Sequence, residues 1–485
     1  MNRTRTGTWL LVGTAAGAVL GLAVTVQVLD WIAIFRETGG SCGTSRGISY
    51  GDCPRYWGTL FGTSLAALMV AVPVLIFALI RARRRGASAA VVAAVVAVYP
   101  GVLIFDALHG ETLPVAWSAP ADRAADTETA GFWHTGDTVV RATAAGLTAY
   151  DTATGAQRWT TTFPGRDVVC AMSRGADGVG LVATHAETAP CARVAAVDLA
   201  TGGTLWELRE TELADGADVL AVLDDAAILV GEKQIRAVGR GDGAPRWQYP
   251  LPERTCGSPR LLAGSHAVVL VHRCDTDTHE LHALDPRTGN LAWQAGVPYE
   301  GARTVTPVSA DPLVVHVAES GKRARSAFAA FDRTGRLTAT IPTDDPELPI
   351  SSIGGTAFAA TPITRTVVTP TTLVAVARPA GGRGYRLVAH ELATGARLWT
   401  GDLLDDDPDA LALDGDRVLV CYDEARVLGL GAADLRSGAD SHVGVALIRH
   451  VHSSFAVLTA PGRYLVVSAD GRSPYHPVQA VAAGR

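Results

Sequence analysis

The sequence predicts an all-β propeller of eight blades, with seven blades as the alternative, preceded by three transmembrane α-helices. Two observations carry this prediction. The N-terminal part of the chain contains three apolar segments without charged residues in their cores. The rest consists of short β-rich segments, in which a hairpin unit with Asp, Gly and Trp at fixed offsets recurs about every 47 residues.

The three apolar segments run over residues 9–29, 58–80 and 87–105. Each is close to the roughly 20 residues that a helix needs to cross a bilayer, and lipid requires that backbone polar groups be satisfied internally. The first segment is too long for a secretory signal, and no small-residue cleavage site follows it. We therefore expect a three-helix membrane anchor over residues 9–106 and a propeller over residues 107–485.

Basic residues indicate the orientation of this anchor, because cytoplasmic loops of membrane proteins are enriched in Arg and Lys. Arg3 and Arg5 precede the first segment, and four arginines fill the short loop 81–86, whereas the longer loop 30–57 has three dispersed arginines. We expect residues 1–8 and loop 81–86 in the cytoplasm, and loop 30–57 and the propeller outside. No ionisable residue lies in the core of a predicted span, which favours an anchor over a transporter.

The hairpin unit has an Asp or Glu, a Gly four residues later, and a Trp four residues after the Gly. The carboxylate can accept hydrogen bonds from the turn, and Gly can adopt the positive φ of a tight hairpin. The Trp then occupies the same point of every hairpin, where it can pack between neighbouring sheets. The residues assigned to this structural motif, degenerate copies and an isolated Trp included, are Asp151, Gly155, Trp159, Asp198, Gly202, Trp206, Gly243, Trp247, Asp285, Gly289, Trp293, Glu391, Gly395, Trp399 and Trp117.

The spacing of the motif glycines, which also include Gly335 and Gly438, suits units of four strands. Residues 439–485 retain strand-like segments without a further copy of the motif, whereas Trp117 stands alone before the first copy. We therefore expect residues 113–118 to complete the last blade and to close the ring. One hairpin cannot bury its apolar surface alone, so the blades must pack on one another.

These units resemble the repeats of the quinoprotein-type β-propellers, which are named for enzymes that bind pyrroloquinoline quinone (PQQ). The whole chain is similar to the membrane-anchored PQQ-binding-like β-propeller repeat proteins. The resemblance implies the propeller fold but not the cofactor, because many such propellers bind no quinone and act as scaffolds.

The residues of a quinone-dependent active site are not found in the sequence. Quinoprotein alcohol dehydrogenases carry two adjacent cysteines, and a Ca²⁺ held by Glu, Asn or Asp. This chain has no adjacent cysteines, and its two asparagines are Asn2 and Asn290. We therefore expect no cofactor, and we assign no catalytic, cofactor-binding or metal-binding residue.

Six cysteines are candidates for disulfides, which persist outside the cytoplasm. The expected pairs are Cys42 with Cys53 in the outer loop, and two cross-strand pairs within single blades, Cys170 with Cys191 and Cys256 with Cys274. The remaining cysteine, Cys421, lies in an alternating apolar segment, which favours a buried and inert thiol.

Two further patterns are weak candidates for metal sites. His450 and His452 would share one face of a strand and could supply half of a zinc site, but no third ligand can be placed. The acidic residues within 405–409 lack the ligand spacing of a calcium loop. An ordinary strand face and a solvated loop are the favoured interpretations.

The net charge of −6 gives no electrostatic reason for binding nucleic acid. We predict a non-enzymatic binding or scaffold module outside the cell membrane, with a protein or envelope ligand at the propeller face. A PQQ-dependent dehydrogenase and an envelope ligand sensor are the alternatives. The sensor is disfavoured because the predicted cytoplasmic parts are very short.

Overall fold

The computed structural model describes most of the chain. The described residues are 2–37, 44–45, 48–49, 57–109, 112–122, 128–163, 167–173, 178–186, 191–209, 213–214, 216, 218–252, 259–274, 278–299, 301–320, 324–351, 365–381, 384–403, 408–424, 427–446, 448, 455–472 and 475–483.

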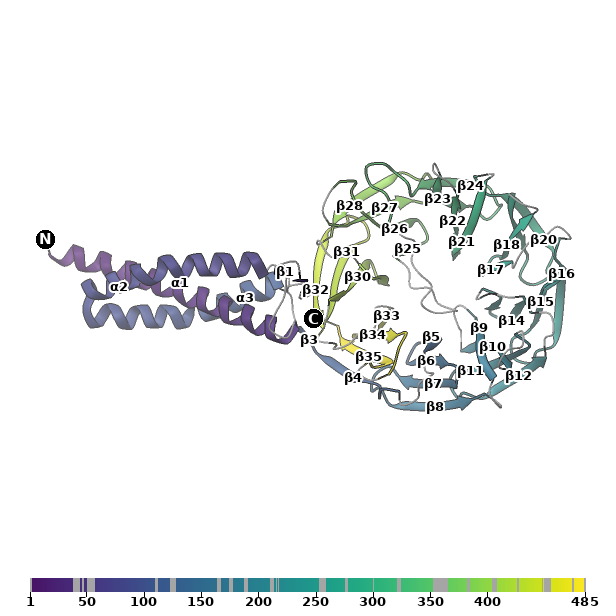
Figure 1. Cartoon of the computed structure of the whole chain (residues 1–485), viewed down its shortest axis with the longest axis horizontal. Coiled ribbons are helices and arrows are strands. Elements are labelled where there is room, and N and C mark those ends of the chain that lie inside the picture. The colour runs from purple at the N-terminus through teal and green to yellow at the C-terminus, as the bar shows by residue number, and fades with distance from the viewer. Residues whose placement is uncertain are drawn as a thin grey trace.

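Three helices form an elongated bundle beside a wheel of β-sheets (Figure 1). They are α1 (Asn2–Glu37), α2 (Trp57–Val96) and α3 (Val98–His109), and two short strands, β1 (Thr44–Ser45) and β2 (Ile48–Ser49), lie between α1 and α2. Three segments are long and apolar enough to cross a membrane, namely Leu11–Phe35, Trp57–Arg81 and Ala87–Asp106. The bundle therefore has the properties of a membrane anchor.

The helices differ from the expected boundaries in two places. The first spanning segment continues past residue 29, and it includes Asp30, whose side chain is buried. The expected loop 81–86 lies within the bounds of α2, because Arg and Ala are strong helix formers.

Contacts with α1 show that the chain still reverses direction within α2. The Ser64 hydroxyl donates to the Gln27 side chain and Ala78 lies near Gly13, so the first half of α2 runs antiparallel to α1. Ala90 lies against Gly17 and Ala94 against Gly21, so the second half runs parallel to α1. Because glycine has no side chain, the backbones can approach closely at Gly17.

Eight sheets form the wheel, and we number them as blades 1 to 8 in chain order. Within blades 1 to 4 the strands pair in sequence order. Blade 1 contains β5 (Thr129–Thr135), β6 (Thr138–Thr143), β7 (Gly146–Asp151) and β8 (Gln157–Thr162), and blade 2 contains β9 (Asp167–Met172), β10 (Val179–Ala186), β11 (Arg193–Asp198) and β12 (Thr204–Arg209). Blade 3 contains β13 (Leu220–Val222), β14 (Ala226–Val230), β15 (Gln234–Gly239) and β16 (Pro245–Pro250), and blade 4 contains β17 (Arg260–Ala263), β18 (Val268–Cys274), β19 (Thr278–Leu284) and β20 (Leu291–Gly296).

Blades 5 to 7 continue this pattern, and blade 8 is completed by a strand from the N-terminal side. Blade 5 contains β21 (Ala302–Ala310), β22 (Leu313–Glu319), β23 (Ser326–Phe331) and β24 (Leu337–Pro342), and blade 6 contains β25 (Thr366–Val368), β26 (Thr372–Ala377), β27 (Arg386–Glu391) and β28 (Arg397–Asp402). Blade 7 contains β29 (Ala410–Asp414), β30 (Arg417–Glu424), β31 (Val427–Asp434) and β32 (Asp440–Ala446), and blade 8 contains β33 (Phe455–Ala460), β34 (Arg463–Ser468), β35 (Val478–Ala482) and β4 (Val115–Ser118).

The pairing of β4 with β35 closes the wheel, with Trp117 opposite Ala480. This confirms the eight-bladed prediction. The closing segment is shorter than expected, because β3 (Thr112–Leu113) instead pairs in parallel with β32 of blade 7. Pro114 lies between β3 and β4 and lacks the N–H that a continuous ladder requires.

The apolar core of the wheel lies between neighbouring blades. Residues of the inner strands are almost fully buried, as in β14, where all five residues are buried. The outermost strand alternates between exposed and half-buried residues in β8, β16, β20 and β28. This alternation arises because one face of the outer strand packs on the wheel and the other contacts solvent.

Candidate functional site

The hairpin between the third and fourth strands of a blade is capped by its acidic residue. In blade 1, Asp151 Oδ1 accepts hydrogen bonds from the backbone N–H groups of Ala153 (3.0 Å) and Thr154 (2.8 Å). The Arg158 guanidinium, together with the Thr154 hydroxyl and N–H, lowers the pKa of Asp151 to about 2. Asp198 and Asp285 cap their hairpins in the same way.

Each Trp of the motif packs on the Gly of the next blade. At the seam between blades 1 and 2, a Cβ atom on Gly202 would lie 2.5 Å from the indole of Trp159. The Trp159 Nε1–H also donates to the carbonyl oxygen of Leu199 at 3.1 Å. The same contact between ring and Gly occurs for Trp117 with Gly155, Trp206 with Gly243, Trp247 with Gly289, Trp293 with Gly335, and Trp399 with Gly438.

The seam between blades 5 and 6 has no Trp, because Ala339 occupies the corresponding position. A Cβ on Gly395 would meet Ala339 at 3.5 Å, which is ordinary van der Waals contact. The hydroxyl of Thr338 donates to the carbonyl oxygen of Leu392 at 3.0 Å. The hydroxyl of Thr338, one residue before Ala339, therefore donates to the carbonyl whose equivalent accepts a hydrogen bond from an indole N–H at other seams.

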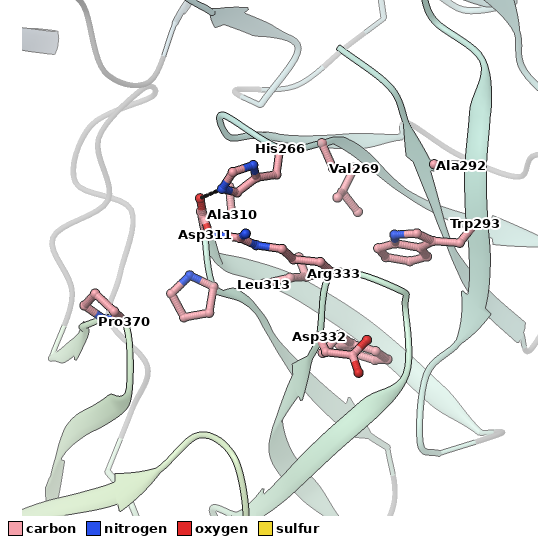
Figure 2. A pocket seen from close by; sticks show the side chains of 13 residues that line it. His266, Val269, Ala292, Trp293, Ala310, Asp311, Leu313, Asp332, Arg333 and Pro370 are labelled. Carbon is pink, nitrogen blue, oxygen red and sulfur yellow. Dashed lines mark ion pairs between the residues drawn. The ribbon is translucent and has the colours of Figure 1, made fainter.

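A cleft of about 660 Å³ opens next to this region, between blades 4 and 5 (Figure 2). Its residues come from the turns β17–β18, β21–β22 and β25–β26 and from the hairpin β23–β24, with further residues on the adjoining strands. In an up-and-down blade these turns lie at the same face of the wheel. The residues that define this cleft, called the 4/5 cleft below, include His266, Trp293, Pro312, Phe331, Arg333 and Pro370.

The 4/5 cleft combines aromatic and proline surfaces with charged groups. Figure 2 shows the Arg333 side chain between Trp293 on one side and the pair formed by His266 and Asp311 on the other. His266 Nε2 lies 3.4 Å from Asp311 Oδ2, and the Ser265 hydroxyl donates to the same oxygen at 3.0 Å. Asp332, which also lines the cleft, accepts hydrogen bonds from Thr334 and Arg336 of its own hairpin. Both carboxylates of the cleft are therefore engaged locally, and the cleft offers an aromatic ring to an apolar side chain and the Arg333 guanidinium to an acidic group.

Of the expected disulfides, the structure contains Cys170–Cys191, which joins the start of blade 2 to the segment before β11, with a Cα–Cα distance of 6.2 Å. The pair Cys42–Cys53 and Cys256 lie outside the described residues, as does the side chain of Cys274. Cys421 is a free and fully buried thiol, and burial raises its pKa.

The other weak candidates are only partly placed. His450, His452 and residues 404–407 lie outside the described residues, and Asp409 lies next to β29. Asn290 is in the hairpin between β19 and β20, near the rim of blade 4. Neither this position nor the absence of adjacent cysteines from the sequence fits the quinone and calcium site of the quinoprotein alcohol dehydrogenases. We derive no quinone chemistry for this chain.

A match to a known protein family lies within the repeats of the propeller. The family model described as outer membrane protein assembly factor BamB matches residues 190–441, which is more than half of the chain. The chain belongs to this BamB family. The match runs from blade 2 into blade 7, and it confirms the expected relationship to the PQQ-type propellers. No curated protein sequence matches the chain.

Several solved structures are similar to this BamB-family chain at low sequence identity. The computationally designed Ika8 protein is 12% identical, with a TM-score of 0.50, and the match covers 77% of this chain and 100% of the designed one. BamB from Moraxella catarrhalis is 18% identical, with a TM-score of 0.46, over 76% of this chain and 99% of BamB. Quinohemoprotein alcohol dehydrogenase from Comamonas testosteroni is 15% identical, with a TM-score of 0.46, over 76% of each chain.

Two features of this BamB-family propeller were not predicted from the sequence. The first is the 4/5 cleft, whose lining comes from turns far apart in the sequence. The second is the convergence of His272, Glu280 and His282, which among the described residues is the group that could hold a metal ion. The alternation Glu280-Leu281-His282 placed two of these side chains on one face of a strand, but the position of His272 depends on the register of a hairpin.

Proposed function

We propose that the protein is a membrane-anchored binding module whose propeller lies outside the cytoplasmic membrane and holds a segment of a partner protein in the 4/5 cleft. The observation that carries this proposal is the cleft itself, where aromatic and proline surfaces surround a guanidinium. The name of the family, that of an assembly factor, supports a protein as the partner.

The shape of the molecule supports this arrangement. In Figure 1 the wheel is seen face-on and the helical bundle extends from its rim within the plane of view. If the bundle crosses the membrane along its length, the wheel stands on its edge and both faces are accessible. The outer strand β20 of blade 4 lies on the side of the wheel away from the bundle, so the cleft is remote from the membrane surface.

The chemistry of the cleft indicates which segment it would accept. Trp293 offers an aromatic ring, and Pro312 and Pro370 offer rigid apolar surfaces from neighbouring blades. Arg333 is exposed and carries a planar guanidinium that pairs well with a carboxylate. An extended peptide with an apolar side chain beside an Asp or Glu fits this combination.

The binding experiment uses cells that express the full chain and compares two charge reversals. Arg333→Glu reverses the charge in the cleft, while Arg436→Glu changes an exposed arginine in the corresponding hairpin of blade 7. After chemical crosslinking, the Arg333→Glu protein should retain less than about a tenth of the partner captured by the wild type, a loss of roughly 1.4 kcal/mol or more. The control should retain it. Equal capture by both variants would exclude the cleft as the binding site.

A second experiment tests the orientation of the anchor. Arg436→Cys places a thiol on the exposed hairpin of blade 7, where a membrane-impermeant maleimide can reach it. We expect labelling in spheroplasts before lysis, because the propeller follows the third spanning segment and the arginines at 81–86 favour the cytoplasm. Labelling only after lysis would place the propeller inside the cell and refute the orientation.

A further inference from the structure

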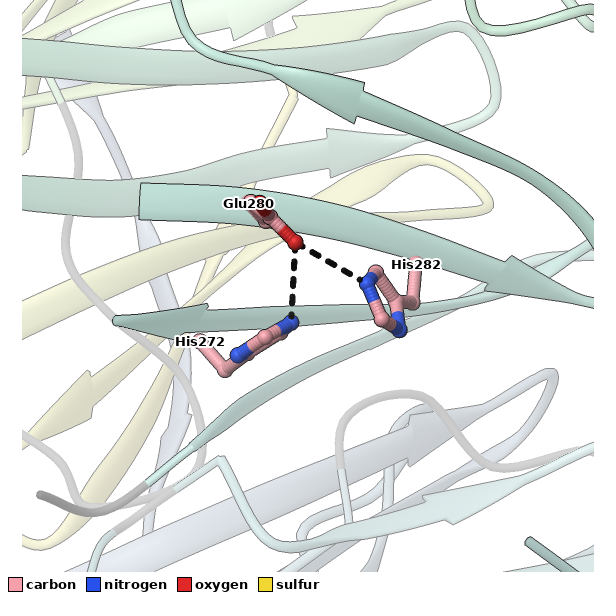
Figure 3. A group of neighbouring side chains, drawn as sticks. All are labelled: His272, Glu280 and His282. Atoms are coloured by element: carbon pink, nitrogen blue, oxygen red, sulfur yellow. Dashed lines mark hydrogen bonds and ion pairs between the residues drawn. The ribbon is translucent and has the colours of Figure 1, made fainter. Parts of the chain in front are cut away.

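A second group of polar side chains lies in blade 4, at the other end of β18 from the 4/5 cleft (Figure 3). In the antiparallel register of β18 and β19, His272 pairs with Glu280 and Leu270 pairs with His282. Opposite residues point to the same face of a sheet, and so do residues two positions apart on one strand. The side chains of His272, Glu280 and His282 therefore converge on one face. Tyr249 of β16 contacts His282, so this face is turned toward blade 3.

The distances within this group match the coordination shell of a small divalent ion. His282 Nε2 lies 3.3 Å from Glu280 Oε2, and His272 Nε2 lies 4.0 Å from the same oxygen. The three ligand atoms lie within 4.8 Å of one another. Ligand atoms at about 2.0–2.1 Å from a tetrahedral zinc ion are about 3.3 Å apart. A small inward movement of His272 would complete this geometry.

Both imidazoles of this group are buried. The His272 side chain is fully buried and that of His282 is 7% exposed. Burial, and next the neighbouring His282, lower the pKa of His272 to about 4. The Glu280 side chain is 41% exposed, so an ion can enter from solvent on its side.

A further side chain orients one of the ligands. The Tyr249 hydroxyl lies 3.1 Å from His282 Nδ1, which leaves Nε2 directed toward Glu280. In metal sites the second ring nitrogen of a ligating His is usually hydrogen-bonded in this way, which fixes the ring and its tautomer. The two rings of His272 and His282 are held edge to face, with centroids 4.5 Å apart.

We propose that His272 Nε2, His282 Nε2 and Glu280 Oε2 bind one Zn²⁺ ion, with the fourth coordination position open toward solvent. Two imidazoles and one carboxylate favour zinc over magnesium or calcium, which prefer oxygen ligands. The ion would crosslink β18 to β19 beside the seam with blade 3. Its open position could take water or a carboxylate from a bound molecule. This site is separate from the 4/5 cleft and does not depend on the function proposed for that cleft.

The experiment uses the full-length protein in detergent, stripped of metal by a chelator and then titrated with Zn²⁺ and with Co²⁺. The variants are Glu280→Gln and His282→Gln. The matched control is His185→Gln, a half-buried His in β10 of blade 2 that belongs to neither the cleft nor the cluster. Circular dichroism establishes that each variant is folded. The partly exposed position of Glu280 makes its variant the less disruptive of the two.

The wild type and the control should each bind one equivalent of Zn²⁺ with the same affinity and should melt at a higher temperature with zinc than without it. The Glu280→Gln and His282→Gln variants should each bind Zn²⁺ at least roughly tenfold more weakly than the wild type. The Co²⁺ complex should show visible absorption typical of a tetrahedral site without the charge-transfer band of a thiolate ligand. The proposal is wrong if the wild type retains no zinc, if a folded cluster variant binds it equally tightly, or if a thiolate band appears.

Discussion

The hydroxyl of Thr338 donates to the carbonyl oxygen of Leu392 at 3.0 Å, across the seam between blades 5 and 6. At five other seams the corresponding carbonyl accepts from an indole N–H, which belongs to Trp117, Trp159, Trp206, Trp247 or Trp399. A hydroxyl thus replaces an indole as donor where the motif has lost its Trp.

Replacing Thr338 by Val should destabilise this seam by about 1–2 kcal/mol, because the carbonyl of Leu392 then loses its donor. The same hydroxyl also lies 3.1 Å from the carbonyl oxygen of Ala330, so the loss affects both blades. Urea unfolding of the full-length protein measures the change. Thr338→Ser keeps the hydroxyl and serves as the control. If the Val and Ser variants lose the same free energy of unfolding, the hydrogen bond does not stabilise the seam.

Gly289→Ala should be strongly destabilising, by about 3 kcal/mol or more, for two reasons. Gly289 has a φ of +70°, which costs an L-residue about 1–2 kcal/mol. In addition, its new Cβ would lie 2.5 Å from the ring of Trp247. The Ala variant therefore combines backbone strain with a steric clash, and both contribute to a lower melting temperature.

Two glycines of similar conformation separate these contributions. Gly178→Ala (φ +75°) has no atom within 4 Å of the new Cβ, and Gly395→Ala (φ +76°) meets only the Trp-free seam at ordinary contact distances. Both should cost about 1–2 kcal/mol, the backbone strain alone. Equal losses for Gly289, Gly178 and Gly395 would show that the indole does not pack against the glycine.

Reduction of Cys170–Cys191 should lower the stability of the propeller by about 3 kcal/mol, because the bridge closes a loop of about 20 residues. We compare thermal unfolding of the Cys170→Ser/Cys191→Ser protein with that of the wild type. Cys421 should resist alkylation in the folded protein and react after unfolding, since it is buried. Rapid alkylation of Cys421 under native conditions would contradict its position in the core.

Stability should fall as the pH decreases from about 6.5 to 4, in part through His316. This side chain is buried against Phe328 with ring centroids 5.2 Å apart, and burial lowers the pKa of His316 to about 4. Because the unfolded chain takes up the proton at a higher pH, the stabilisation present above pH 6.5 is lost as pH falls toward 4. His316→Phe should show a shallower loss over this range. An unchanged pH profile in this variant would remove His316 as a cause.

The blade pattern could be predicted because each blade must place the same groups at the same turn. Asp, Gly and Trp recur at fixed offsets, and Trp117 at the N-terminal side signalled the missing strand. The structure adds that each Trp stands opposite an Ala of the third strand, as Trp159 does with Ala149. Alanine leaves room for the indole, a signal that was visible in the sequence but not interpreted.

The two sites could not be predicted in the same way, because they depend on contacts between segments. The 4/5 cleft joins His266 and Pro370, which come from blades 4 and 6. The histidine cluster requires that His272 face Glu280, and this pairing is set by the register of β18 against β19. Hydrophobic alternation predicts which face of each strand is buried but does not specify that register.

Photo-crosslinking from the cleft tests most directly whether this propeller is a protein-binding module. A photoreactive phenylalanine analogue replaces Ala292, which lines the cleft without contributing a binding group, in one protein and Arg436 in another, and intact cells are irradiated. We predict a discrete adduct with a partner protein from position 292 and none from position 436. No adduct from either position, or the same adducts from both, would contradict the assignment of the cleft as the binding site.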